Sequence, residues 1–259
     1  MKNHFSSGKL KVTAIHATIS LVVAILISII VFNIWFPGQI ANISHTAAIY
    51  WLIISVDVIC GPILLMLVWN LKKTRKELIF DTTIIAAIQI AALAYGLWSI
   101  YQIRPVHIVF ETDRLRLINA SEIDPGDLTN APERWKTMPL LGPELISTLT
   151  PNDGQEMLRS IDLSIAGKEP SVRPEMWEEY APAKEKVRAA SRTLAELLEV
   201  YPEKQTEINR LAKKFDVPYD AILWLPFTSA RSMDWVALID ARNMEPFTYI
   251  PGDGFIPRR

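Results

Sequence analysis

The stretch Thr46–Leu71 is TAAIYWLIISVDVICGPILLMLVWNL, and Asp57 is its single charged residue. A helix needs about 20 mostly apolar residues to cross the hydrocarbon core of a bilayer, and this stretch is longer than that. Two runs of the same kind flank it: Val12–Phe36 has no charged residue, and Leu78–Ile103 has only Asp81. Three such runs with short connections predict three membrane-spanning helices rather than the buried helices of a water-soluble protein.

Charge separates these helices from the rest of the chain. Of the 27 basic and 28 acidic residues, eight and three lie in residues 1–104, which leaves 19 and 25 downstream. The sequence therefore predicts a transmembrane domain, residues 1–104, followed by an acidic domain, residues 105–259. Nucleic-acid binding needs a basic surface that neutralises phosphates, so we do not expect this chain to bind nucleic acid.

The positions of the basic residues predict the orientation of the helices, because basic segments beside membrane spans stay in the cytoplasm. They precede the first span and fill the second connection, whereas the first connection, Pro37–His45, has none. We therefore expect a cytoplasmic N-terminus and an extracytoplasmic C-terminal domain. The first run is too long for a signal peptide and no cleavage site follows it, so we expect it to remain as an anchor. The basic residues are Lys2, Lys9 and Lys11, then Lys72, Lys73, Arg75 and Lys76.

The C-terminal domain is long enough to bury a core of its own. The single cysteine, Cys60, lies in the second span, so that core forms without disulfides. Between Asn119 and Pro174, prolines and glycines indicate loops and short helices whose order the sequence leaves open. Alternating and helical apolar patterns elsewhere predict an α+β domain. The predicted elements are a hairpin of Val106–Glu111 and Arg114–Ile118 around Thr112–Asp113, the helices Pro174–Tyr201 and Glu203–Phe215, and the strands Ala221–Thr228, Trp235–Asp240 and Pro246–Ile250.

Motifs for catalysis or cofactor binding are missing. The sequence has no glycine-rich phosphate loop, CxxC pair or GxSxG elbow. A catalytic triad needs a histidine within hydrogen-bond reach of its nucleophile, but the predicted topology spreads His4, His16, His45 and His107 over three compartments. Only His107 lies in the folded domain, and its apolar neighbours favour a structural role. We therefore expect no enzyme activity, no metal site and no cofactor.

The second span carries the most costly residue of the chain. An acid at the centre of a span costs about 2.5–3.5 kcal/mol to insert, so Asp57 needs a polar partner. That partner is either another protein's helix or a group of the same bundle, such as Ser55, Gln89 or Tyr95, and the sequence leaves both readings open.

Gly61 and Pro62 follow one turn after Asp57. Proline lacks the N–H that would bond the carbonyl of Val58, so we expect a kink and a freed carbonyl beside the acid. Gln89, Tyr95 and Gly96 of the third span add hydrogen-bonding groups and a point of close approach, although such residues also occur as ordinary contacts within a bundle.

Seven features are spread along the chain: Asp57 with Gly61-Pro62, Asp81, Gln89, Ala91–Gly96, Arg104-Pro105-Val106, Val109–Arg114 and Asp234–Ala241. Together they resemble the type IV pilin accessory proteins of the TfpX/TfpZ type. The resemblance covers most of the chain and includes the expected membrane-exit and hairpin residues Arg104, Pro105, Asp113 and Arg114.

The resemblance implies a non-enzymatic protein of a Gram-negative inner membrane that helps a major pilin become a surface fibre. Such a pilin waits in the membrane as one long apolar helix with an acid near its start, and it and the pilus assembly machinery are the expected partners. An enzyme is disfavoured by the missing constellation. A periplasmic ligand sensor is the alternative, although the predicted cytoplasmic parts are too small for an output domain.

Overall fold

A computed structural model describes residues 2–68 and 73–257, with side chains described from Lys11 onward. The chain divides into two compact units, residues 1–103 and residues 104–259. Each unit is described below by itself. The predicted end of the second span at Leu71 and the basic residue Lys72 lie outside the described residues, as do the side chains of Lys2 and Lys9.

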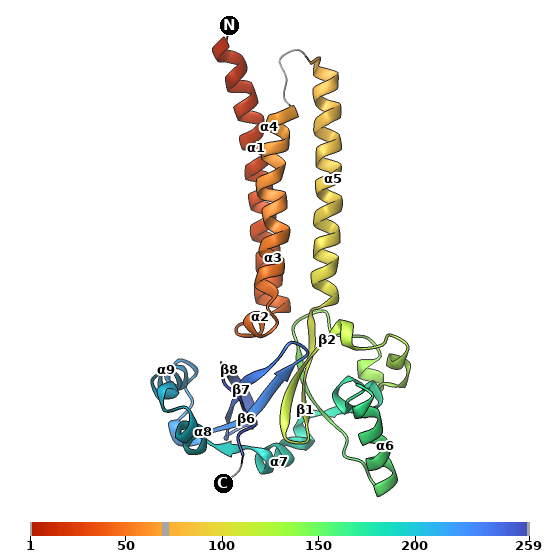
Figure 1. The fold of residues 1–259 in the computed structure, drawn as a ribbon, viewed down its shortest axis with the longest axis vertical. Helices are drawn as coiled ribbons and strands as arrows, with labels where there is room; N and C mark the ends of the chain where they lie inside the picture. The colour runs from red at the N-terminus through yellow and green to blue at the C-terminus, as the bar shows by residue number, and fades with distance from the viewer. Residues whose placement is uncertain (1, 69–72, 258–259) are drawn as a thin grey trace. The chain divides into compact units, whose positions relative to one another are not determined.

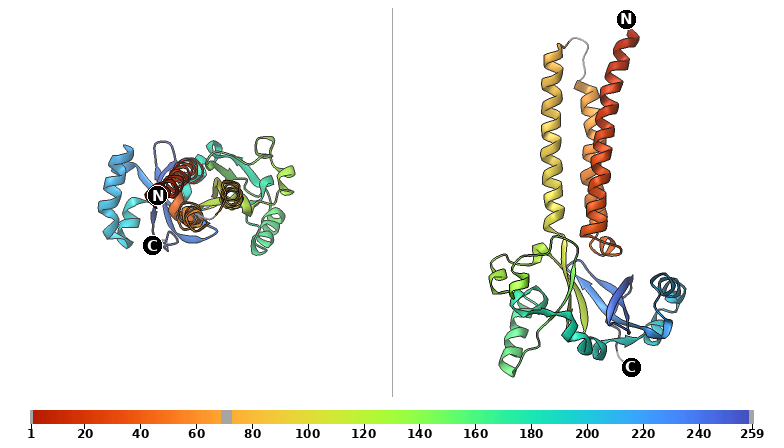
Figure 2. Two further views of the ribbon diagram at one scale, coloured as in Figure 1. Left: turned by 90° about the horizontal axis from the view of Figure 1, so that it is seen from above. Right: turned by 180° about the vertical axis from the view of Figure 1, so that it is seen from behind.

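Three long helices make up the first unit (Figures 1 and 2), and they confirm the predicted apolar helices. The first is α1, Lys2–Ile29, which continues as the π-helix η1, Ile30–Trp35; the short α2, Ile40–Ile43, follows. The second helix consists of α3, Thr46–Ser55, then the π-helix η2, Val56–Cys60, and α4, Gly61–Val68. The third is α5, Arg75–Gln102, with Thr74 and Glu77 forming its capping box. By length and composition, the three spans Lys11–Trp35, Thr46–Val68 and Arg75–Gln102 can each cross a membrane.

The helix does not end at Pro62. The residues before it, Val56–Cys60, adopt π-helical hydrogen bonding, and α-helical bonding resumes at Gly61. In a π-turn each N–H bonds the carbonyl five residues back instead of four. This change of bonding lets the helix continue although Pro62 has no N–H to donate. Such insertions are frequent at functional sites, and this one contains Asp57.

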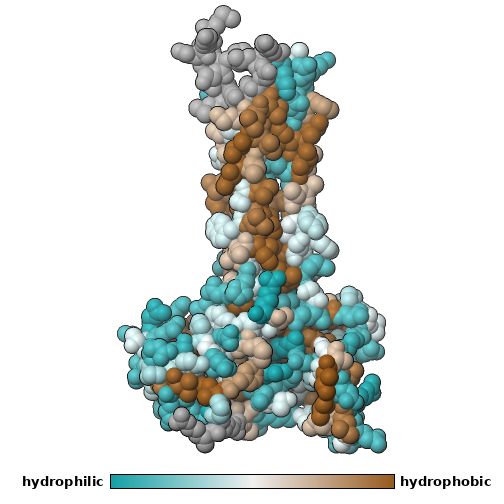
Figure 3. Space-filling model, viewed as in Figure 1, coloured by the Kyte–Doolittle hydropathy of each residue, from teal (hydrophilic) through white to brown (hydrophobic). Residues whose placement is uncertain are grey.

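Apolar side chains cover the long helices. Figure 3 shows them in brown along the visible face of the helical unit, whereas polar side chains, in teal, cover most of the second unit. Fewer than a quarter of the residues in the most apolar window of each span are buried within the chain. Exposure of so much apolar surface to water would be strongly unfavourable, so the surface is of the kind that an apolar environment stabilises.

The second unit is an α+β domain around a mixed sheet with the strand order β4-β3-β1-β2-β6-β7-β8, in which β5 pairs with β6. Strands β1 and β2 form the predicted hairpin, and β6, β7 and β8 are the three predicted C-terminal strands. Two neighbouring pairs, β1 with β3 and β2 with β6, are parallel. The strands are β1 Pro105–Glu111, β2 Arg114–Asn119, β3 Glu144–Thr148, β4 Trp177–Glu179, β5 Arg192–Thr193, β6 Ile222–Ser229, β7 Ser232–Asp240 and β8 Glu245–Pro251.

The single long helix predicted over Pro174–Tyr201 is wrong. This segment forms the 3-10 helix η7, Pro174–Met176, then β4, helix α7 (Tyr180–Ala190), β5 and helix α8 (Leu194–Val200). Pro182 has no N–H for the carbonyl of Glu178, so it can occupy only the first turn of a helix, as it does in α7. A second start signal, the Thr193–Glu196 capping box, begins α8.

Between Asn119 and Pro174 the expected loops and short helices also include a strand. Its parallel partner, β1, is distant in sequence, so no local hairpin signal marks β3. Asp153 caps helix α6, Gly154–Ile165, by accepting hydrogen bonds from two backbone N–H groups. The remaining elements of the unit are the 3-10 helices η3 Ala120–Glu122, η4 Asp127–Asn130, η5 Glu133–Trp135, η6 Pro170–Val172, η8 Pro202–Lys204 and η9 Tyr219–Ala221, and the helix α9 Gln205–Phe215, which lies within the predicted Glu203–Phe215.

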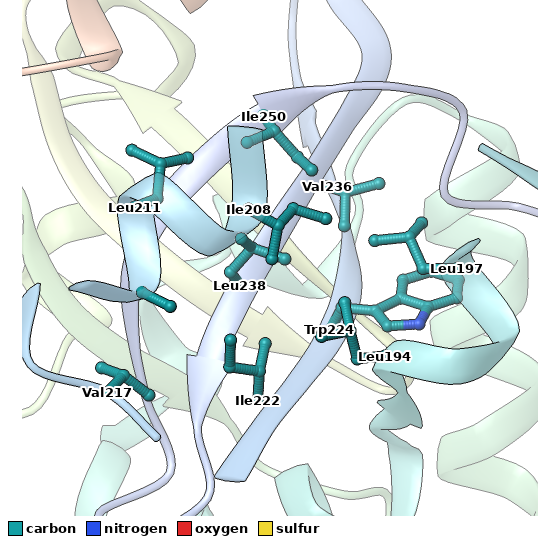
Figure 4. Packing of buried hydrophobic residues seen from close by; sticks show 11 residues of the cluster. Leu194, Leu197, Ile208, Leu211, Val217, Ile222, Trp224, Val236, Leu238 and Ile250 are labelled. Atoms are coloured by element: carbon teal, nitrogen blue, oxygen red, sulfur yellow. The ribbon is translucent and has the colours of Figure 1, made fainter. Parts of the chain in front are cut away.

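Two hydrophobic clusters stabilise this sheet. Figure 4 shows the first, in which Trp224 of β6 and Leu238 of β7 pack against helices α8 and α9. The second lies around β1 and β3 and includes Val109, Trp135 and Trp177. Burial of these side chains contributes the main stabilising free energy of a domain without cysteine.

Candidate functional site

Asp57 lies in the π-helical turn η2, and its hydrogen-bond partner comes from the third helix. The amide Nε2 of Gln89 is 3.3 Å from the backbone oxygen of Asp57 and 3.4 Å from its Oδ1. These are long hydrogen bonds, and they link the second helix to the third. Of the three internal partners considered for Asp57, Gln89 makes this contact, whereas the hydroxyl of Ser55 donates to the carbonyl of Leu52 at 2.9 Å.

Gly61 makes the close approach of three helices possible. It is buried, and a Cβ at this position would overlap the amide of Gln89 and lie 2.8 Å from Nε2 of His16. A side chain at this position would therefore displace the amide of Gln89 and the ring of His16 from their present places. Pro62 follows it and is half-buried in the first turn of α4.

His16 of α1 is the residue that sequence reasoning missed at this site. Its Nε2 and the Oε1 of Gln89 are buried and have no hydrogen-bond partner among the described residues. Together His16, Asp57 and Gln89, here called the polar cluster, bring one residue from each long helix to the same depth. The signal in the sequence was a lone histidine within an apolar run, but the rotation of each helix, which sequence does not give, decides whether it faces Asp57.

An apolar groove of about 380 Å³ opens beside the polar cluster, between the second helix and α5. Asp57 and Gln89 line it, and most of the other lining side chains are aliphatic, including Leu52, Leu64 and Ile88. Tyr95 also lines the groove, but it is 70% exposed and its ring lies 6.0 Å from that of Trp98.

Further along the groove, Gly96 is buried against Ile53, which fixes the spacing of α3 and α5. The groove is thus an apolar surface with one carboxyl group and one amide group in its lining.

The residues predicted to lie at the membrane exit and in the hairpin form a separate group in the second unit. Arg104 is 4% exposed and donates from Nε and Nη2 to the carbonyl of Pro139, while Pro105 begins β1. Asp113 is exposed in the hairpin turn, and Arg114 pairs with Glu111 and with Glu169. These contacts are structural in kind: they attach the hairpin to the loops that surround it.

His107 is fully buried in β1, and its ring lies 4.6 Å from that of Trp177. Burial lowers its pKa to about 3, so the imidazole is neutral at ordinary pH. Within residues 2–68 and 73–257, no group of three His, Cys, Asp or Glu side chains is placed to hold a metal ion.

Comparison with known proteins gives a consistent result. A family model described as "Fimbrial assembly protein FimB" matches residues 5–38. The "Fimbrial assembly protein, serogroup I" of Dichelobacter nodosus is 31% identical over 246 residues, 95% of each chain, and its serogroup E1 counterpart is 30% identical over the same share. The counterpart of serogroups C1 and C2 is 37% identical over 121 residues, 47% of this chain and 92% of that protein. No solved structure matches the chain significantly.

Proposed function

The chain belongs to the family of fimbrial assembly proteins, as its resemblance to type IV pilin accessory proteins predicted, and from that premise we propose that it assists a pilin within the bacterial inner membrane. In this proposal the protein is not an enzyme. It holds the apolar helix of an unassembled pilin beside its own helices, and its second unit faces the periplasm.

The location is supported by the three long helices and by the positions of the basic residues. Each helix is long enough to cross a bilayer, and its surface is mostly apolar. Lys73, Arg75 and Lys76 follow the second helix, which favours a cytoplasmic position for this connection. An odd number of spans then carries residues 104–259 to the periplasmic side.

The observation that carries the proposal is that two residues of the polar cluster, Asp57 and Gln89, line the apolar groove. A pilin helix has the apolar surface that such a groove can cover, and interhelical hydrogen bonds within a membrane contribute about 0.6–1.7 kcal/mol each. Asp57 offers an acceptor and Gln89 a donor to a polar side chain of the incoming helix. A bundle that served only as an anchor would not need an acid at this depth.

Site-specific photocrosslinking in cells tests the proposal, and α5 offers a matched pair of positions. Ile88 lines the groove and is 63% exposed, whereas Ile90 is 67% exposed and is not among the residues that line it. A photoreactive residue at position 88 should crosslink to pilin, and one at position 90 should not.

Leu64 and Ile63 provide the same comparison on α4, since Leu64 lines the groove and Ile63 is exposed outside it. Equal crosslinking within both pairs would show that pilin is merely abundant nearby. Absence of a pilin adduct at both groove positions, with normal piliation of the labelled strains, would refute contact through the groove.

A further inference from the structure

Two adjacent leucines are exposed in the loop that precedes β3. Leu140 is 62% exposed and Leu141 is 72% exposed. A single exposed leucine is ordinary on a protein surface, but an adjacent pair on a short loop is a small apolar projection. Residues 138–142 are here called the dileucine loop.

The residues that flank the two leucines hold the loop in place. Arg104 donates to the carbonyl of Pro139 from Nε at 3.3 Å and from Nη2 at 3.2 Å. Met138 packs against the hydrophobic cluster around β1. Pro139 restricts the backbone, and Gly142 has a φ of +45°, a value that other residues rarely adopt. These contacts restrict the turn, so the exposed position of the two leucines is fixed by the structure of the loop.

The same contacts place the dileucine loop beside the point where the chain leaves α5. Arg104 is the second residue after Gln102, the last residue of α5, so the backbone between them spans about 7 Å at most. The sheet register agrees: β3 is parallel to β1 and its first residue, Glu144, pairs with His107. The segment before Glu144 then runs beside the segment before His107, which is residues 104–106 at the start of the second unit.

From this juxtaposition we propose that the dileucine loop is a membrane-contacting element that inserts Leu140 and Leu141 into the interfacial region of the bilayer. The proposal rests on the proposed location of α5 in a membrane. We assign a lipid surface as the partner of the two leucines because the apolar helix α5 ends two residues before Arg104, the residue that holds the loop. The loop would fix the second unit against the bilayer at a second point beside its covalent connection.

Helix α6 supplies a matched control surface within the same unit. Leu158 of α6 is 65% exposed, close to the value for Leu140. Met157 of α6 lines a pocket together with Asp113, at the turn of the hairpin, and this turn is the end of β1 opposite to Arg104. A residue on α6 should therefore meet water.

The experiment uses the full-length protein with Cys60→Ser, reconstituted in vesicles of phosphatidylethanolamine and phosphatidylglycerol. A nitroxide label is attached to a cysteine at position 140, 141, 158 or 90, the last being the exposed Ile90 of α5. Its collision rates with oxygen, which concentrates in lipid, and with a nickel chelate, which stays in water, are compared. Oxygen should dominate at positions 90, 140 and 141, at a shallower depth for the loop, and the chelate should dominate at position 158.

The remaining outcomes overturn the proposal in distinguishable ways. If position 90 reports lipid while positions 140 and 141 behave like position 158, the loop inference is wrong and the membrane location stands. If positions 140 and 141 are closed to both reagents, protein rather than lipid covers the loop. If position 90 reports water, α5 is not in the bilayer and both proposals fail.

Discussion

Replacing Asp57 with leucine separates a partner contact from an internal one. At the centre of a span, aspartate costs about 2.5–3.5 kcal/mol and leucine gains about 0.3–0.6 kcal/mol, so Asp57→Leu should insert about 3–4 kcal/mol more favourably. The internal contact that is lost is small. It is a hydrogen bond of 3.4 Å from Gln89, worth about 0.6 kcal/mol on average, and the same amide keeps the backbone oxygen of residue 57 as an acceptor at 3.3 Å.

The balance predicts that the leucine variant accumulates at least as well as the wild type. If Asp57 contacts pilin, loss of one interhelical hydrogen bond of about 0.6–1.7 kcal/mol weakens the complex roughly 3- to 20-fold. Surface pili should fall accordingly. Asp57→Asn, which keeps a hydrogen-bonding side chain, should retain most of them.

The assay measures membrane protein level by immunoblot and surface pili by shearing and electron microscopy, in the same cultures. Gln89→Leu is measured alongside, because it removes the same intramolecular contact from the other side together with the donor proposed to face pilin. Full piliation by an accumulated Asp57→Leu protein would refute a pilin contact. A defect that follows protein level in both variants would show that the contact only stabilises the bundle.

Four further predictions follow from the two units. A reporter active only outside the cytoplasm should work when fused after Ile118 and fail after Lys73, and the reverse would invert the orientation. The isolated residues 104–259 should unfold in one cooperative transition in urea, followed by circular dichroism, and the transition should be the same with and without reductant. Burial lowers the pKa of His107 from 6.5 to about 3, so near pH 5 the unfolded domain binds a proton that the folded domain does not. The free energy of unfolding should therefore fall by about 2 kcal/mol between pH 7 and pH 5. An equal fall in the His107→Phe variant would contradict this. Trp224 is fully buried, so Trp224→Ala should lower the free energy of unfolding by about 3–5 kcal/mol in urea titrations. A loss below about 1 kcal/mol would mean that the cluster around β6 is not a main source of the domain's stability.

The parts of the fold that sequence predicted are those decided by local patterns. The long apolar runs, the hairpin around Thr112–Asp113 and the three C-terminal strands each have a period or a turn signal within a few residues. Prediction failed where long-range pairing or competing local signals determine the secondary structure of a segment. Strand β3 depends on β1 as a parallel partner, and an apolar helical period concealed the two breaks in Pro174–Tyr201.

The sequence singled out two residues of the polar cluster, Asp57 and Gln89, but neither His16 nor the geometry of the cluster. Asp57 and Gln89 stood out because polar groups are costly in an apolar run, and the structure brings them together. Tyr95 is likewise a polar residue within an apolar run, yet its ring is exposed and lies beside that of Trp98. His16 joins the cluster only because of how α1 is rotated against α4, and no single-sequence pattern fixes that rotation.

The weakness of the contacts in the polar cluster is consistent with a factor that must release what it holds. Hydrogen bonds of 3.3–3.4 Å between Gln89 and Asp57 can be exchanged for bonds to another helix at little net cost, since each contributes about 0.6 kcal/mol. Gly61 allows this exchange because it leaves room only for the amide of Gln89 and the ring of His16, which can rotate without moving the backbone. A pilin helix held by one or two such bonds would dissociate readily when the growing fibre offered a larger apolar interface. A tight, fully satisfied polar pocket would instead retain the pilin in the membrane and oppose its assembly.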